Sequence, residues 1–359
     1  MTPKERVRAA MELKPVDRIP VFPVVTAYLG SRALERRYKD MVLNPALVYD
    51  GLRAIHRRFG FDGFEVGLGP GRNSPTPKTA VRDGVSYLMD PSGQKPVARL
   101  EDDDMPVPLA GTPLLSDKSA LDSITVTRAS EYVDAGCTAP VEELMRELGD
   151  QAFVAGVAGG QSMNSLVAWR GSEQAILDLT DDPAFVHEAM ERATAISIEV
   201  GKALIQAGVD GIYIGDAWAS ASIISPRMYE EFCLPYHHKA AAEFQKLGTK
   251  VYLHVCGNSG PLAELMAATG VDAIEPLDVD GGVDLEDVKA RVGDRVCLKG
   301  GVSTALLLGG TPGQVYADAG RCIEILGPRG HILGSADDIP RDTPFANIDA
   351  MVQAAADYC

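Results

Sequence analysis

The sequence contains no long hydrophobic run and little positive charge. No stretch of its 359 residues approaches the roughly 18 uninterrupted apolar residues that a membrane-spanning helix needs. Lys and Arg total 34 against 50 Asp and Glu, which gives a formal net charge of −16. Because so acidic a surface repels phosphate backbones and anionic lipids, we expect neither nucleic acid nor membrane as a partner. Small-molecule chemistry is the class that remains.

Cysteine is also scarce. Six cysteines are scattered through the chain, too sparsely for a disulfide scaffold, so reduced thiols are expected and a thiolate metal ligand is available. The composition, 46% hydrophobic and 23% charged, is that of an ordinary globular protein. The opening MTPKERVRAAMELKPVDRIP has a charged helical pattern rather than that of a signal peptide. We therefore expect a folded cytoplasmic protein.

Eight short apolar runs rich in Val and Ile recur along the chain, each entered from a Gly or Asp turn. Helical patterns follow the later runs, and strands that alternate with helices predict a parallel sheet. Eight such units fit a (β/α)8 TIM-type barrel better than an open sheet, and no GxGxxG motif follows any run. The runs are RIPVFPVV (18–25), FDGFEVGL (61–68), QAFVAGVA (151–158), VDGIYIGD (209–216), KVYLHVCG (250–257), VDAIEPLD (271–278), RVCLKGGV (295–302) and GHILGSAD (330–337).

Residues 69–135 interrupt this alternation. Within them, RNSPTPKTAVRDGVSYLMDPSGQKPVARL predicts a β-hairpin with turns at 83–84 and 91–93, followed by the acidic loop EDDDMP. We expect one domain over 1–359 with an N-terminal helical extension. The hairpin would be inserted after the second strand, where insertions often form one wall of the active site.

The most specific chemical pattern is His254-Val255-Cys256, at the end of the fifth run. Active sites of such barrels lie at the carboxyl ends of the strands, and side chains two apart on a strand share a face. An imidazole and a thiol would therefore point together, which suits zinc with its nitrogen and sulfur ligands. The pattern lacks a third ligand. A buried Cys beside a hydrogen-bonded His, and a nucleophilic Cys, are the alternatives.

Carboxylates end several other runs. Asp337, in SADDIPRDTP after the eighth run, is a candidate third zinc ligand or substrate contact. Asp216 and Glu65 are candidate catalytic acids or bases. Asp216 could instead be the outer partner of a ligating His. Its structural alternative is bonding to neighbouring loop amides, and that of Glu65 is pairing with an Arg. His237 and His238 fall in a helical pattern and are interpreted as surface or packing residues.

Four further polar residues are candidates for substrate binding. Three of them end or closely follow apolar runs, and the fourth follows the first run by three residues. For one of them, Glu275, a capping or solvated role is the alternative. The four residues are Tyr28, Asn258, Glu275 and Ser335.

Six segments spread over nearly the whole chain carry a family resemblance: KERVRAAMELKPVDRIPVFP, VDGIYIGDAWASASIISPRMYEEFCLPY, KVYLHVCGNSGPL, IEPLD, LKGGVST and GHILGSADDIPRDTPFANIDAMV. They resemble the uroporphyrinogen decarboxylase superfamily, which implies a TIM-type barrel and a cytoplasmic enzyme. True decarboxylases carry an RQAGR segment after the first strand that binds the porphyrinogen propionates. The corresponding PVVTAYLGSR has no arginine before Arg32, which argues against porphyrinogen decarboxylation.

The other branch of this superfamily comprises corrinoid-linked methyltransferases, whose zinc site is HxC followed much later by a Cys. His254 and Cys256 match the first two ligands, and Asp337 stands where the third Cys is expected. A carboxylate makes the metal less electron-rich, which favours a methoxy or methylamine substrate over a thiol. Since no DxHxxG pattern occurs, the resemblance implies that a partner protein carries the corrinoid.

The resemblance thus predicts a zinc-dependent methyltransferase of one-carbon metabolism. It would move a methyl group between a corrinoid (cobalamin) protein and a small methylated substrate, as in O-demethylation, or a thiol or folate acceptor. A homodimer is the default assembly. Two alternatives stay open. A metal-free decarboxylase-like lyase would require Asp216 or Asp337 rather than Cys256, and a non-catalytic barrel would bind a corrinoid protein or tetrapyrrole as an accessory subunit.

Overall fold

A computed structural model describes residues 1–109 and 113–358 of the chain. Its main sheet is parallel, with seven strands in the spatial order β1-β6-β7-β8-β9-β10-β11. Seven of the eight predicted runs form these strands. The strands are β1 (Gly63–Val66), β6 (Phe153–Gly160), β7 (Gly211–Gly215), β8 (Lys250–His254), β9 (Ala273–Glu275), β10 (Cys297–Val302) and β11 (His331–Ser335).

The first predicted run is extended but is not an assigned strand. Its Pro20 and Pro23 have no amide N–H, so the hydrogen-bond ladder is interrupted. A single parallel bridge remains, Val21 with Leu333 of β11, and the Phe22 amide donates to the Leu333 carbonyl at 2.8 Å. On the other side the Asp62 amide, just before β1, donates to the Val21 carbonyl at 2.7 Å. This segment therefore joins β11 to β1 and closes the barrel.

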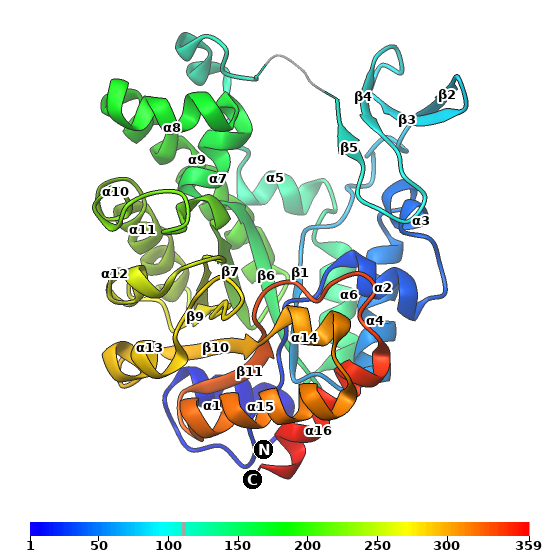
Figure 1. The fold of residues 1–359 in the computed structure, drawn as a ribbon. Coiled ribbons are helices and arrows are strands. Elements are labelled where there is room, and N and C mark those ends of the chain that lie inside the picture. The colour runs from blue at the N-terminus through cyan, green and yellow to red at the C-terminus, as the bar shows by residue number, and fades with distance from the viewer. Residues whose placement is uncertain (110–112, 359) are drawn as a thin grey trace.

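Helices surround the sheet and one longer region departs from it (Figure 1). The N-terminal helix α1 is capped by Thr2, whose hydroxyl accepts from the Glu5 amide at 3.2 Å. The helices are α1 (Pro3–Met11), α2 (Ala27–Ala33), α3 (Tyr38–Leu43), α4 (Leu47–Phe59), α5 (Ala129–Asp134), α6 (Ala139–Leu148), α7 (Ser162–Arg170), α8 (Ser172–Asp181), α9 (Pro183–Gln206), α10 (Pro226–Phe232), α11 (Leu234–Gln245), α12 (Ala263–Ala268), α13 (Leu285–Val292), α14 (Thr304–Gly309), α15 (Pro312–Leu326) and α16 (Phe345–Asp357), with short 3-10 turns at Lys118–Ser123, Ala217–Ala219 and Gly260–Leu262.

The insertion after β1 is larger than the predicted hairpin. It is a four-stranded antiparallel sheet of β2 (Thr79–Arg82), β3 (Val85–Met89), β4 (Pro96–Arg99) and β5 (Val107–Pro108). The predicted turn at 83–84 joins β2 to β3, and both of its residues have positive φ. In Figure 1 this small sheet stands apart from the barrel, while both chain termini lie together at the other end of the molecule.

The cysteines and the helices are both subjects of expectations from the composition. The five cysteines among the described residues are free. No helix in the described ranges is both long enough and apolar enough to cross a membrane.

Candidate metal centre at the barrel mouth

His254, Cys256 and Asp337 meet at the carboxyl ends of β8 and β11. One ligand atom from each lies within 4.8 Å of the other two, and His254 Nε2 is 3.7 Å from Asp337 Oδ1. The histidine is buried, whereas the other two side chains are partly exposed. At zinc bond lengths of about 2.0–2.3 Å, ligands of one tetrahedral ion lie about 3–4 Å apart. Small side-chain movements would therefore bring all three atoms onto one ion.

The orientation of the His254 ring is set by a buried carboxylate. Its Nδ1 lies 3.1 Å from Oε1 of Glu275. Glu275 is the residue on the neighbouring strand β9 that pairs in register with His254. A carboxylate only accepts, so Nδ1 carries the proton and donates to Glu275. The other ring nitrogen, Nε2, faces Asp337 at 3.7 Å and would offer its lone pair to a metal ion in exchange for a proton. A carboxylate behind a ligating histidine is a recurrent arrangement in protein metal sites.

The electrostatics of this cluster favour positive charge at its centre. Burial opposes the charged form of His254, but hydrogen bonds with Cys256 and Glu275 outweigh it and raise its pKa to about 10. Burial alone would raise the pKa of Glu275, but Lys299 and His254 together hold it below its ordinary value. The metal-free cluster thus already stabilises a cation where a zinc ion would bind.

Lys299 and Glu65 continue this network into the barrel interior. The Lys299 Nζ forms a very close ion pair with Glu275 Oε2 and lies 3.5 Å from Glu65 Oε1. Glu65 Oε1 also accepts from the Tyr252 hydroxyl at 2.7 Å, whereas Oε2 is buried without a hydrogen-bond partner. Burial raises the pKa of Glu65 to about 7. The sequence analysis gives Lys299 no role, although a lysine within the apolar run RVCLKGGV is a signal for one.

The loop that carries Cys256 is held by Asp278. Its Oδ2 accepts from the Gly257 amide at 2.9 Å, and its Oδ1 accepts from the Gly281 amide at 2.7 Å. A Cβ atom at Gly281 would lie 2.6 Å from Asp278 Oδ2 and 2.8 Å from the carbonyl carbon of Gly257. The loop after β8 and the loop after β9 therefore pack in direct contact, and only glycine fits at residue 281.

Asp216 directly follows β7, and its amide donates to the His254 carbonyl at 3.0 Å. It is fully buried, and its oxygens accept from the Asn164 amide at 2.7 Å and from the Ser162 hydroxyl at the start of α7. His237 Nε2 is 2.9 Å from Asp216 Oδ2, and His237 Nδ1 is 3.0 Å from the Tyr229 hydroxyl. Asp216 therefore bonds to the first turn of α7 and to His237 rather than to loop amides, and His237 is a buried packing residue.

The structure places the four candidate substrate-binding residues in different surroundings. Glu275 has both oxygens engaged within the protein, as described above. Ser335 is buried and accepts from the Val24 amide at 3.3 Å. The hydroxyl of Tyr28 donates to Asp104 of the insertion at 2.5 Å and accepts from a backbone amide. Asn258 is partly exposed on the loop that follows Cys256.

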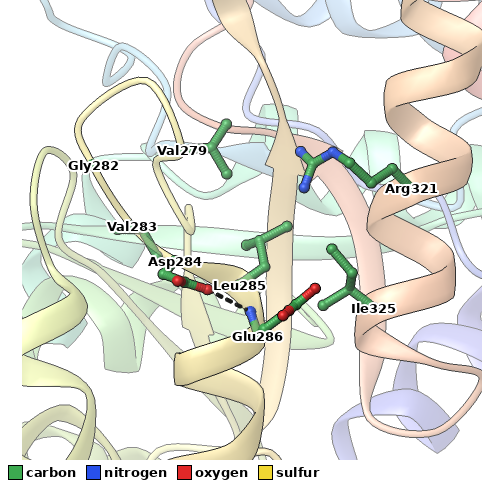
Figure 2. A pocket seen from close by; sticks show the side chains of 8 residues that line it. All are labelled: Val279, Gly282, Val283, Asp284, Leu285, Glu286, Arg321 and Ile325. Carbon is green, nitrogen blue, oxygen red and sulfur yellow. Dashed lines mark hydrogen bonds between the residues drawn. The ribbon is translucent and has the colours of Figure 1, made fainter.

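A separate hollow of about 500 Å³ lies on the outside of the barrel between α13 and α15. Figure 2 shows its lining, in which the carboxylate of Asp284 accepts from the Glu286 amide at 2.9 Å. Arg321 points toward it, but that guanidinium is already paired with Asp318 at 2.9 Å. None of the residues His254, Cys256 and Asp337 lines this hollow, so it is not continuous with the candidate metal centre.

The known proteins that are similar to this chain include both decarboxylases and a methyltransferase. A uroporphyrinogen decarboxylase from Coxiella burnetii is 31% identical over 184 residues, which cover 50% of this chain and 49% of that protein. The chain thus spans about half the length of the decarboxylases it matches. The methylcobamide:CoM methyltransferase MtbA of Methanosarcina mazei is 26% identical over 99% of this chain and 98% of its own.

A solved structure of a methyltransferase from Methanosarcina mazei shares the fold. It superposes with a TM-score of 0.79 at 20% identity and covers 100% of this chain and 99% of its own. The profile of the uroporphyrinogen decarboxylase (URO-D) family matches residues 104–358. The chain therefore belongs to the uroporphyrinogen decarboxylase family.

Proposed function

We propose that this protein is a zinc-dependent methyltransferase that exchanges a methyl group with a corrinoid protein. The observation that carries the proposal is the meeting of His254, Cys256 and Asp337 at the mouth, with Glu275 behind the imidazole. The alignment with a methylcobamide:CoM methyltransferase over nearly the whole chain supports it. The URO-D match supports the barrel on which the site is built.

The donor set fits zinc. Nitrogen, sulfur and oxygen are all zinc ligands in proteins, and three protein ligands leave one position open for a substrate, as in catalytic sites. When bound there, the ion would act as a Lewis acid on the heteroatom of the substrate. The residues around it do the positioning. Glu275 fixes the imidazole, and Asp278 fixes the backbone on which the thiol is carried.

The ligand set also indicates the class of methylated substrate. Asp337 gives the site a carboxylate where a second thiolate is expected, and harder oxygen ligands suit ether or amine substrates better than thiols. In the direction of demethylation, the bond between the heteroatom and the methyl carbon breaks. The electron pair of cobalt(I) forms the new bond to carbon, and the leaving heteroatom keeps its pair and takes up a proton. The reverse transfer would deliver the methyl group to a thiol or folate.

A metal-free lyase is the second candidate, because several relatives are named uroporphyrinogen decarboxylases. Such a reaction needs an acid or base that contacts the substrate. Asp216 is fully buried with its oxygens engaged by Ser162, Asn164 and His237, which disfavours that role. Asp337 remains available to either chemistry. The two candidates therefore differ in whether Cys256 is needed.

The test is methyl transfer to cob(I)alamin, used as a probe in place of the corrinoid protein. The zinc-loaded protein is offered methoxy and methylamine compounds, and conversion to methylcobalamin is followed by its visible spectrum. We expect conversion by the wild type and by Cys137→Ser, a control thiol that is also partly exposed, and none by Cys256→Ser. Equal activity of Cys256→Ser and the wild type would exclude the proposal. Carbon dioxide release from a carboxylated compound by Cys256→Ser would establish the lyase.

A further inference from the structure

Lys299, on β10, is a lysine enclosed by the barrel. Its side chain is 1% exposed, and Nζ lies 4.3 Å from the centre of the Phe22 ring and 5.1 Å from that of Tyr252. Burying an ammonium group is costly unless a carboxylate pairs with it. An apolar side chain would fill the same space without this cost in desolvation free energy. Packing alone therefore does not explain a lysine in the barrel interior.

The two carboxylates beside Lys299 are not equivalent. Glu65 lies 3.5 Å away and shares its Oε1 with the Tyr252 hydroxyl. Glu275 is in much closer contact through Oε2, while its Oε1 is occupied by His254 Nδ1. A single carboxylate therefore bridges the lysine and the imidazole, and both of its oxygens are used. Three buried side chains from β10, β9 and β8 form one continuous chain that ends at the candidate ligand.

We propose that Lys299 is a positioning residue for the metal site: it holds the Glu275 carboxylate in place, and Glu275 in turn holds the His254 ring with Nε2 toward the ion. This inference rests on the proposed function, because it assumes that His254 is a ligand. Without Lys299, the Glu275 carboxylate would lose one of its two anchors and could rotate toward other donors. The ring of His254 would then lose its fixed direction. Substitution of a residue that orients a metal ligand typically weakens metal binding by about 10–100-fold.

The experiment measures the zinc dissociation constant by competition with a chromophoric chelator. We expect Glu275→Gln to weaken zinc binding by about 10–100-fold and Lys299→Met by about tenfold. Because Lys299 acts through Glu275, the double variant should bind no more weakly than Glu275→Gln alone. Lys299→Arg should restore most of the affinity. Lys250→Met is the matched control, because it breaks a lysine–carboxylate pair with Asp272 at the far end of β8.

A spectroscopic readout separates positioning from a general loss of stability. Cobalt(II) in place of zinc gives visible bands whose position and intensity follow ligand geometry. These bands should shift in Lys299→Met and in Glu275→Gln, and should be unchanged in Lys250→Met. Thermal unfolding of each variant shows whether it is folded. Should Lys299→Met fail to fold, Lys299→Gln, which keeps a hydrogen-bond donor, replaces it in the same measurements.

Failure of the role of Lys299 can be distinguished from failure of the proposed function. Zinc affinity and cobalt bands that are unchanged in Lys299→Met would overturn this inference while the proposed function stands. Additive losses in the double variant would also overturn it, because Lys299 would then act independently of Glu275. A wild-type protein that binds no zinc would overturn the proposed function and this inference together.

Discussion

Replacing Asp337 with alanine tests whether the carboxylate is a ligand. Its Oδ1 is 3.7 Å from His254 Nε2, so a modest movement would place both atoms on one ion. Structural zinc sites bind with about 10–16 kcal/mol shared among four ligands, so one ligand contributes about 3 kcal/mol. Since 1.4 kcal/mol is a factor of ten, Asp337→Ala should weaken zinc binding by about two orders of magnitude. Competition with a chelator of known affinity measures this change.

The neighbouring Asp338 provides the control for charge. It lies outside the ligand cluster, and burial of its carboxyl raises its pKa to about 6, so at pH 8 its removal takes away the same formal charge. A nearby charge that does not ligate the ion contributes about 1 kcal/mol, so Asp338→Ala should weaken zinc binding by about fivefold at that pH. Equal losses in Asp337→Ala and Asp338→Ala would show that Asp337 acts only through its charge. Unchanged affinity in Asp337→Ala would refute its assignment as the third ligand.

Two further predictions concern the barrel interior and the thiol loop. Burial raises the pKa of Glu65 from 4.5 to about 7, so the folded state holds this proton at a pH where the unfolded chain has lost it. The free energy of unfolding should therefore fall by up to about 3 kcal/mol as pH rises from about 4.5 to 7. Urea unfolding at pH 5 and pH 8 measures this fall, which should be smaller in Glu65→Gln than in the wild type. Gly281→Ala should displace the Cys256–Gly257 backbone and weaken zinc binding by about tenfold, whereas Gly313→Ala, in open space, should not.

The barrel itself could be predicted because its signal repeats. Seven runs of Val and Ile separated by helical patterns became seven parallel strands at the expected places. The exception also has a local cause, since Pro20 and Pro23 remove two amide donors from the first run. The size of the insertion was less predictable. The two-residue strand β5 is too short to produce any alternation of hydrophobicity in the sequence.

The three candidate ligands could be identified because strand ends converge. Cys256 and Asp337 are far apart in sequence, yet the rule that parallel strands end at one face places both at the same mouth. What the sequence alone does not determine is which way a polar side chain turns at a strand end. Asp216 and Glu275 both end apolar runs, but one bonds to the start of α7 and the other to His254 and Lys299. Those partners come from distant parts of the chain.

The most direct test of the account is the zinc content of the purified protein after it is offered zinc without chelator. Plasma mass spectrometry on the tag-free wild type, Cys256→Ser and the control Cys137→Ser gives the metal-to-protein ratio. We predict a ratio near one for the wild type and Cys137→Ser, and close to zero for Cys256→Ser. A wild type without zinc, or a Cys256→Ser variant that retains it fully, would contradict the assignment of the barrel mouth as a metal centre.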